Sequence, residues 1–230
     1  MYKYETHLHT KEASACAGAT GREMVIAYKE AGYAGIIVTD HFFYGNTGVD
    51  RSLPWEDWVE AFAKGYENAK KAGDEMELQV FMGWESCYQG TEFLVYGLDK
   101  PWLLAHPEIK DATIEEQWEL VNQYNGLIVH AHPFRDEPYI PEVRLFPQYV
   151  HAVEGINATH SSPLSYSHRN PEFNTRAIAY AKEQGLPMTS GSDAHINVVF
   201  GGGILVEKPL ESIADYVELI KGRGKYELAE

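Results

Sequence analysis

Basic residues are scarce in this sequence of 230 residues. Lysine and arginine total 19 against 34 aspartates and glutamates, so the formal net charge is −15 at pH 7 with neutral histidine. Affinity for nucleic acid comes mainly from lysine and arginine side chains that neutralise phosphates. The charge balance therefore argues against a nucleic-acid backbone as the principal partner.

Cysteines and long apolar runs are also scarce. The two cysteines, Cys16 and Cys87, could form at most one bridge, which excludes a disulfide framework and fits a reducing compartment. No apolar run approaches the roughly 20 residues that span a bilayer. The first ten residues, MYKYETHLHT, lack the apolar stretch of a signal peptide. We therefore expect a cytoplasmic protein with no membrane partner.

Apolar runs of strand character alternate with segments of helical spacing along the chain. We expect strands at 2–8, 35–41, 78–86, 92–98, 126–134, 152–158, 187–195 and 202–207, and helices near 21–32, 55–72, 112–125, 172–184 and 210–222. This alternation is typical of an α/β protein, and the third and fourth strands favour a hairpin. Because no linker or charge block divides the chain, we predict one domain over residues 1–230, built as a barrel or a doubly wound sheet.

Histidines and acidic residues fall at the ends of the predicted strands. They are His7, His9, Asp40, His41, Glu85, His130, His132, Asp193 and His195. Residues two apart on a strand point to the same face, so a pair such as His7 and His9 can bind one ion. Imidazole and carboxylate ligands suit Zn²⁺ and, with more oxygen around the ion, Mn²⁺ or Fe²⁺. As separate polar groups these residues would leave many buried charges without partners, so we predict a metal site.

The motifs that carry these residues resemble, in order, those of the PHP (polymerase and histidinol phosphatase) family. They are His-Leu-His-Thr at 7–10, Thr-Asp-His at 39–41, Gly-Trp-Glu at 83–85, His-Pro at 132–133 and Gly-Ser-Asp-Ala-His at 191–195. The resemblance implies a distorted (β/α)7 TIM-like barrel that holds two or three divalent metal ions (Zn, Mn or Fe) and usually hydrolyses phosphate monoesters. The metal-ligand positions that it carries over are His7, His9, His41, Glu85, His132, Asp193 and His195, with Glu85 as the bridging carboxylate.

The sequence departs from the family pattern at two ligand positions. Shortly after the first His-x-His, where the family commonly has an aspartate or histidine, this chain has Cys16. Cys16 is either a thiolate ligand or a small buried thiol. After the glutamate motif, where a second histidine often follows, the nearest candidate ligand is Glu92. A carboxylate there would favour a harder metal.

Three further residues are candidates for chemistry on the substrate. Asp40 and His160 are alternative proton donors to the leaving group, although His160 is equally consistent with an exposed loop position. Arg135 follows the His-Pro motif and could bind a phosphate or carboxylate at the rim of the barrel. The glycine run 201–203 lacks the spacing of a phosphate-binding loop, and it predicts a close backbone approach instead.

These observations favour a metal-dependent phosphoesterase that acts on a small phosphorylated metabolite. One alternative is a phosphodiesterase or nuclease, which the net charge disfavours. A second is a degenerate metal-binding regulatory module, which loss of the ligand to a third metal ion near residue 14 would favour. A third is an amidohydrolase-like barrel, which would require a lysine that bridges the metals. The sequence leaves the native metal and the oligomeric state open.

Overall fold

A nearly closed ring of seven strands forms the centre of the molecule. The computed structural model describes residues 1–138, 140 and 142–230. The strands are β1 (Tyr2–Leu8), β2 (Gly35–Val38), β3 (Gln79–Tyr88), β4 (Thr91–Tyr96), β5 (Leu127–His130), β6 (Ala152–Asn157) and β7 (Met188–Gly191). Neighbouring strands pair in parallel except β4, which is antiparallel to both β3 and β5. A parallel bridge between Leu8 and Ala194 joins the segment after β7 to β1. The predicted barrel is confirmed, with β4 as its distortion.

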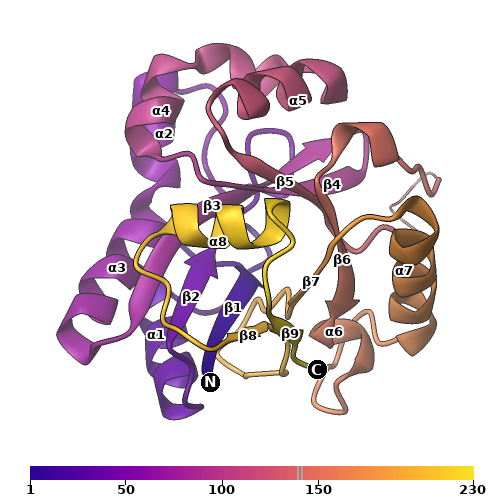
Figure 1. The fold of residues 1–230 in the computed structure, drawn as a ribbon. Helices are drawn as coiled ribbons and strands as arrows, with labels where there is room; N and C mark the ends of the chain where they lie inside the picture. The colour runs from indigo at the N-terminus through magenta and orange to yellow at the C-terminus, as the bar shows by residue number, and fades with distance from the viewer. Residues whose placement is uncertain (139, 141) are drawn as a thin grey trace.

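Helices cover the outside of this ring (Figure 1). They are α1 (Gly21–Glu30), α2 (Trp55–Phe62), α3 (Lys64–Met76), α4 (Lys100–Ala105), α5 (Ile114–Gln123), α6 (Ala158–Ser161), α7 (Pro171–Gln184) and α8 (Ile213–Lys221), with 3-10 turns η1 (Pro107–Asp111) and η2 (Pro147–Tyr149). Thr20 and Thr113 begin α1 and α5 with reciprocal capping boxes, which satisfy backbone donors of the first turn. Within the described residues, no helix combines the length and the apolar character needed to cross a membrane.

The helix expected near 55–72 is two helices, because the chain turns at Ala63 between α2 and α3. The turn brings Gly65 against the loop that follows β1. A Cβ atom built on Gly65 would lie 1.9 Å from Thr10 Oγ1 and 2.5 Å from Asp40 Oδ2. Only a glycine allows this approach, so α3 packs directly behind residues that follow the first two strands.

Two short strands and α8 close the opposite, amino end of the ring. β8 (Ile204–Val206) pairs antiparallel with β1, and β9 (Glu227–Leu228) pairs with β8. Glycines 201–203 enter β8 with φ angles of 108°, 79° and 108°, and a Cβ on Gly203 would lie 2.3 Å from Tyr4 O. The backbone approach predicted for this run is therefore present. Tyr216 and Ile220 of α8 pack into a buried cluster with Tyr4 and Leu127.

Candidate metal centre

The carboxyl end of the ring gathers histidines and carboxylates from six of its strands and the segments after them. Donor atoms from these side chains form four overlapping groups of three, and within each group all atoms lie within 4.8 Å of one another. The groups are His7, Glu85 and His132; His7, His9 and Asp193; His41, Glu85 and Glu92; and His9, His41 and His195. The structure thus brings together eight of the nine residues that the sequence predicted as ligands, and Cys16 is outside these groups.

The two histidines of the first motif are oriented by their outer ring nitrogens. His7 Nδ1 lies 2.8 Å from Glu154 Oε1, and His9 Nδ1 lies 3.2 Å from Ser14 Oγ. Because Ser14 donates its own proton to Asp40, it accepts from His9, and the carboxylate of Glu154 accepts from His7. When the rings are neutral, as a metal ligand requires, these bonds place the proton of each on Nδ1 and leave the lone pair on Nε2.

With both rings in this neutral form, the two Nε2 atoms face each other with no hydrogen atom between them. They are 3.2 Å apart, and they lie 3.4 Å (His7) and 3.1 Å (His9) from the same oxygen, Asp193 Oδ1. Two lone pairs and a carboxylate oxygen that converge in this way repel one another, and a shared cation relieves that repulsion. The donor set therefore fits a divalent metal ion.

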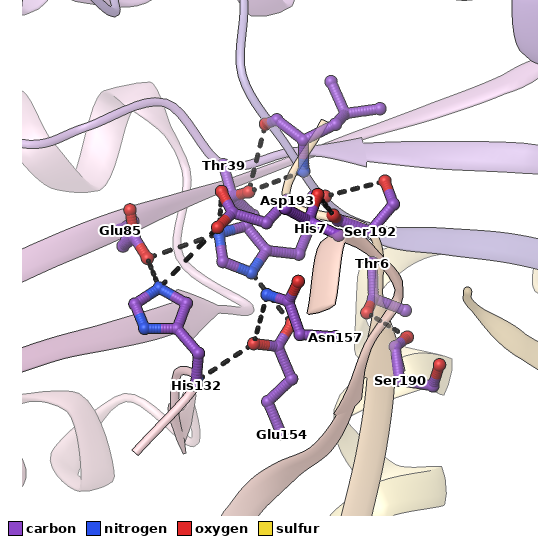
Figure 2. Close-up of polar contacts among 12 residues, drawn as sticks. Thr6, His7, Thr39, Glu85, His132, Glu154, Asn157, Ser190, Ser192 and Asp193 are labelled. Carbon is purple, nitrogen blue, oxygen red and sulfur yellow. Dashed lines mark hydrogen bonds and ion pairs between the residues drawn. The ribbon is translucent and has the colours of Figure 1, made fainter. Parts of the chain in front are cut away.

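Glu85 faces three of the converging histidines, and Figure 2 shows its contact with His132. Its Oε1 is 3.1 Å from His132 Nε2 and 3.3 Å from His7 Nε2, whereas its Oε2 is 2.8 Å from His41 Nδ1. Burial alone would raise the pKa of Glu85, but His7 and His41, in their protonated forms, lower it well below its ordinary value. The side chain is thus an ionised carboxylate whose two oxygens face different histidines, which is the geometry that a bridging ligand needs.

Two of the converging residues have left-handed backbone conformations. The φ angles are 26° at His132 and 55° at Asp193, each just after a strand of the ring. For residues other than glycine, such a conformation raises the free energy by about 1–3 kcal/mol, and conformations of this kind cluster at functional sites. Asp193 is also paired with the guanidinium of Arg135. Although burial would raise the pKa of Asp193, Arg135 and His7 lower it well below its usual range.

Glu154 on β6 is a residue of the site that the sequence analysis missed. Its Oε1 accepts from His7, and its Oε2 accepts from the backbone N–H of His132 at 3.0 Å and from Asn157 Nδ2 at 3.1 Å. Figure 2 shows how this one carboxylate holds two of the converging histidines. The available signal was a glutamate in the middle of the strand AVEGIN, where every residue is buried and the only other polar side chain is Asn157 at its end.

Asp40 lies behind the cluster, and it is not among the residues that line the cavity. Its carboxylate accepts from the Thr10 backbone N–H and Thr10 Oγ1, both at 2.6 Å, and from Ser14 Oγ at 2.7 Å. Ser14 in turn accepts from His9 and from the backbone N–H of His41. Burial raises the pKa of Asp40 to about 6. This placement favours a role in positioning His9 and His41 over the predicted proton transfer to a substrate.

His160, the other predicted proton donor, is buried in α6, directly after β6, so the alternative of an exposed loop position is wrong. Its Nδ1 lies 3.0 Å from Asn174 Oδ1, and its Nε2 accepts from Arg135 Nε at 3.1 Å. Burial and the neighbouring Arg135 lower the pKa of His160 to about 2. A neutral ring with both nitrogens already bonded holds Arg135 in place, and it has no proton directed at a substrate.

A cavity of about 590 Å³ opens in front of the cluster. Its volume lies in the range of small-molecule sites. Its wall includes His41, Glu92, Asp193 and His195, together with the predicted substrate-binding residue Arg135.

Cys16 lies on the same cavity wall. Although burial would raise its pKa, hydrogen bonds with His195 and His41 lower the pKa of Cys16 to about 6. The thiol therefore lies beside two of the converging histidines, and because the residue is exposed, the alternative of a small buried thiol is wrong. Its role as a ligand stays a prediction, because no donor group includes it.

Comparison with known proteins identifies relatives of the fold. Residues 171–221, from α7 to α8, match a family model described as PHP-associated. No curated protein is significantly similar in sequence. A two-domain protein from Bacteroides vulgatus, described as containing a predicted PHP-like metal-dependent phosphoesterase, shares the fold with a TM-score of 0.67 and 14% identity. That match covers 99% of this chain, which spans 64% of the length of the Bacteroides protein.

Two further structures share the fold. One is a candidate metal-dependent phosphoesterase from Bifidobacterium adolescentis, with a TM-score of 0.56, 15% identity and 96% of both chains covered. The other is an amidohydrolase from Chromobacterium violaceum with bound sulfate, with a TM-score of 0.59, 15% identity and coverage of 94% of this chain and 95% of that one. Residues 171–221 are thus similar to the PHP-associated family model, and the chain as a whole shares the barrel fold of these structures.

Proposed function

We propose that this protein is a metal-dependent phosphoesterase that hydrolyses the phosphate monoester of a small metabolite. The observation that carries the proposal is the convergence of His7 Nε2, His9 Nε2 and Asp193 Oδ1, which a divalent cation would satisfy. The likeness of the barrel to proteins described as metal-dependent phosphoesterases supports the same reaction class.

Two or three divalent ions would be held by the eight converging residues, with Glu85 between the donor groups. When bound, such ions polarise a phosphoryl oxygen and lower the pKa of a bound water. The mixture of imidazole nitrogen and carboxylate oxygen suits Zn²⁺, Mn²⁺ or Fe²⁺. Glu92 adds oxygen to the group with His41 and Glu85, which favours the harder ions of this set.

Arg135 would bind the anionic part of the substrate. Its side chain is buried, and it is fixed on two sides by Asp193 and His160. A guanidinium held rigidly at a cavity wall can form charge-assisted hydrogen bonds with a phosphate at little cost in side-chain entropy. Because Asp193 balances the charge of Arg135, the bound cations would supply most of the local attraction for an anionic substrate in a protein with a net charge of −15.

Metal analysis of the purified protein, followed by a panel of phosphate monoesters and diesters, tests the proposal. We expect about two or three equivalents of Zn, Mn or Fe, and faster hydrolysis of monoesters than of diesters or single-stranded DNA. Glu85→Gln should lower kcat by at least about 10³-fold in a folded protein. The matched control is Glu108→Gln, which changes an exposed glutamate beside His106 and should leave kcat unchanged. Metal-loaded protein that hydrolyses no phosphate ester would refute the proposal.

A further inference from the structure

A second cavity of about 400 Å³ adjoins the cavity in front of the metal centre. It lies between the turn that joins β3 to β4 and the segment that runs from η1 into α5. Tyr44, Cys87 and Gly90 line both cavities, so the two lie side by side. None of the eight converging residues is on the wall of the second cavity. This space is therefore suited to a part of the substrate other than its phosphate.

Aromatic and aliphatic side chains form a large part of the second wall. Phe42, Ile109 and Ile114 are buried members of one hydrophobic cluster. The ring of Phe42 stacks on Trp84 and meets Trp58 edge to face, with ring centroids 5.5 and 5.2 Å apart. Because these contacts hold the wall in place, the cavity favours a flat apolar group that fits an existing surface.

The charged side chains of this wall balance each other. The Tyr44 hydroxyl donates to Asp111 Oδ1 at 2.6 Å, which holds the tyrosine ring at the boundary between the two cavities. Asp111 also pairs with Lys110, whose Nζ lies 5.4 Å from the ring centroid of Phe43. Since Lys110 and Asp111 neutralise one another, the cavity is better suited to a neutral group than to a second anion.

Gln117 of α5 adds a polar group that the fold leaves unsatisfied. The residue is only 7% exposed, and it lines the second cavity. Among the residues that the structure describes, its side chain has no hydrogen-bond partner. Buried polar groups are normally paired, so this amide points to a ligand. Its donor and acceptor lie side by side, and they match a group that offers an acceptor and a donor in the same way, such as another amide.

We propose that the second cavity binds the leaving group of the substrate, and that this group is a neutral aromatic ring with an amide-like edge bonded to Gln117. The inference rests on the proposed phosphoesterase function. The phosphate would lie at the metal ions and Arg135, while the alcohol part would extend past Tyr44 into the second cavity. The substrate class is then the phosphate esters of ring-bearing alcohols, and small polyol phosphates would be poor substrates.

Three phosphate esters separate the contributions of the ring and the amide. They are ethyl, benzyl and 4-carbamoylbenzyl phosphate, whose primary alcohols are similar leaving groups. We expect KM to fall by at least about 10-fold from the ethyl to the benzyl ester, because the ring becomes buried. A further fall of about 10-fold should accompany the carbamoyl group, because it satisfies the buried amide.

Gln117→Met removes the amide at nearly unchanged volume. It should reduce the KM preference for the carbamoylbenzyl over the benzyl ester from about 10-fold to about 1. The matched control is Gln123→Met, which changes an exposed glutamine of the same helix that lines neither cavity and should keep the preference. Tyr44→Ala, at a residue that is 57% exposed, tests the cavity through a second side chain. It should reduce the preference for benzyl over ethyl phosphate by about 5-fold.

Calorimetry with benzylphosphonate and 4-carbamoylbenzylphosphonate, which are not hydrolysed, measures the same preference as a ratio of Kd values for metal-loaded protein. A preference that is present in the wild type and lost in Gln117→Met supports the assignment. If the wild type hydrolyses all three esters with equal KM, the inference fails and the proposed function stands. If the phosphonates bind with the expected preference but no ester is hydrolysed, the proposed function fails, and the cavity holds no leaving group. Equal losses of preference in Gln117→Met and Gln123→Met would also overturn the inference.

Discussion

The inner and outer parts of the site are held in place by different means. The inner part consists of His7, His9, Glu85, His132 and Asp193, whose side chains are at most 4% exposed. Buried acceptors on neighbouring strands and loops orient its histidines. The outer part consists of Cys16, Glu92, His168 and His195, which are more exposed and lie on the cavity wall.

This difference indicates a division of labour. The inner side chains come from both ends of the chain, since His7 and Asp193 meet where the segment after β7 closes on β1. Changes there should alter metal affinity and folding stability together, because the same buried contacts serve both. Changes in the outer part should alter turnover or substrate preference while the fold is retained.

The largest effect is expected for Glu154→Ala. The substitution removes the acceptor of His7 Nδ1 and of the His132 backbone N–H, and both groups are buried. Breaking such a buried pair should lower the free energy of unfolding by about 3 kcal/mol and metal affinity by about 10–100-fold. Glu92→Ala, in the outer part, should lower the free energy of unfolding of the metal-free protein by less than about 1 kcal/mol. Chemical denaturation measures the free energy of unfolding and metal titration measures the affinity, and equal losses of unfolding free energy in the two metal-free variants would remove the distinction.

An intermediate effect is expected for Arg135→Ala, because Arg135 lies between the two parts. Loss of one charge-assisted contact with the substrate phosphate should weaken binding by about 1.5–3 kcal/mol, measured as a rise in KM. Metal content should stay unchanged, because Arg135 contacts one oxygen of Asp193 and Oδ1 faces His7 and His9. If the variant had an unchanged KM but bound less metal, Arg135 would instead be a residue that positions the side chains of the inner part.

The smallest effect is expected for Cys16→Ser. Cys16 is an exposed residue outside the four donor groups, so we expect metal stoichiometry and unfolding free energy to change little. Loss of one metal equivalent in elemental analysis would instead identify the thiolate as a ligand. Cys87→Ser is the matched control on the same cavity wall.

The positions of the converging residues could be predicted because they depend on local patterns. Alternation along a strand gives His7 and His9 one face, and the carboxyl ends of parallel strands meet at one end of a barrel. The antiparallel β3–β4 hairpin also follows from two apolar runs close in sequence.

The roles of the supporting residues could not be predicted in the same way. His7 and Glu154 are 147 residues apart, and the contact between them exists only once the ring has closed. Asp40 and His160 have the chemistry of proton donors, but Thr10 and Asn174 occupy their polar atoms in the fold. The division of the predicted helix at Ala63 similarly follows from the contact of Gly65 with Thr10, which no helical pattern encodes.

Thermal denaturation of verified metal-free protein, with and without added Mn²⁺ or Zn²⁺, tests most directly whether the inner part is a metal centre. An ion bound only by the folded state and present at 100 times its Kd stabilises that state by about 2.7 kcal/mol. For a chain of this size, that free energy corresponds to a rise in Tm of at least about 5 °C. We expect such a rise, and we expect it to shrink in Glu154→Ala. An unchanged Tm on metal addition would contradict the account.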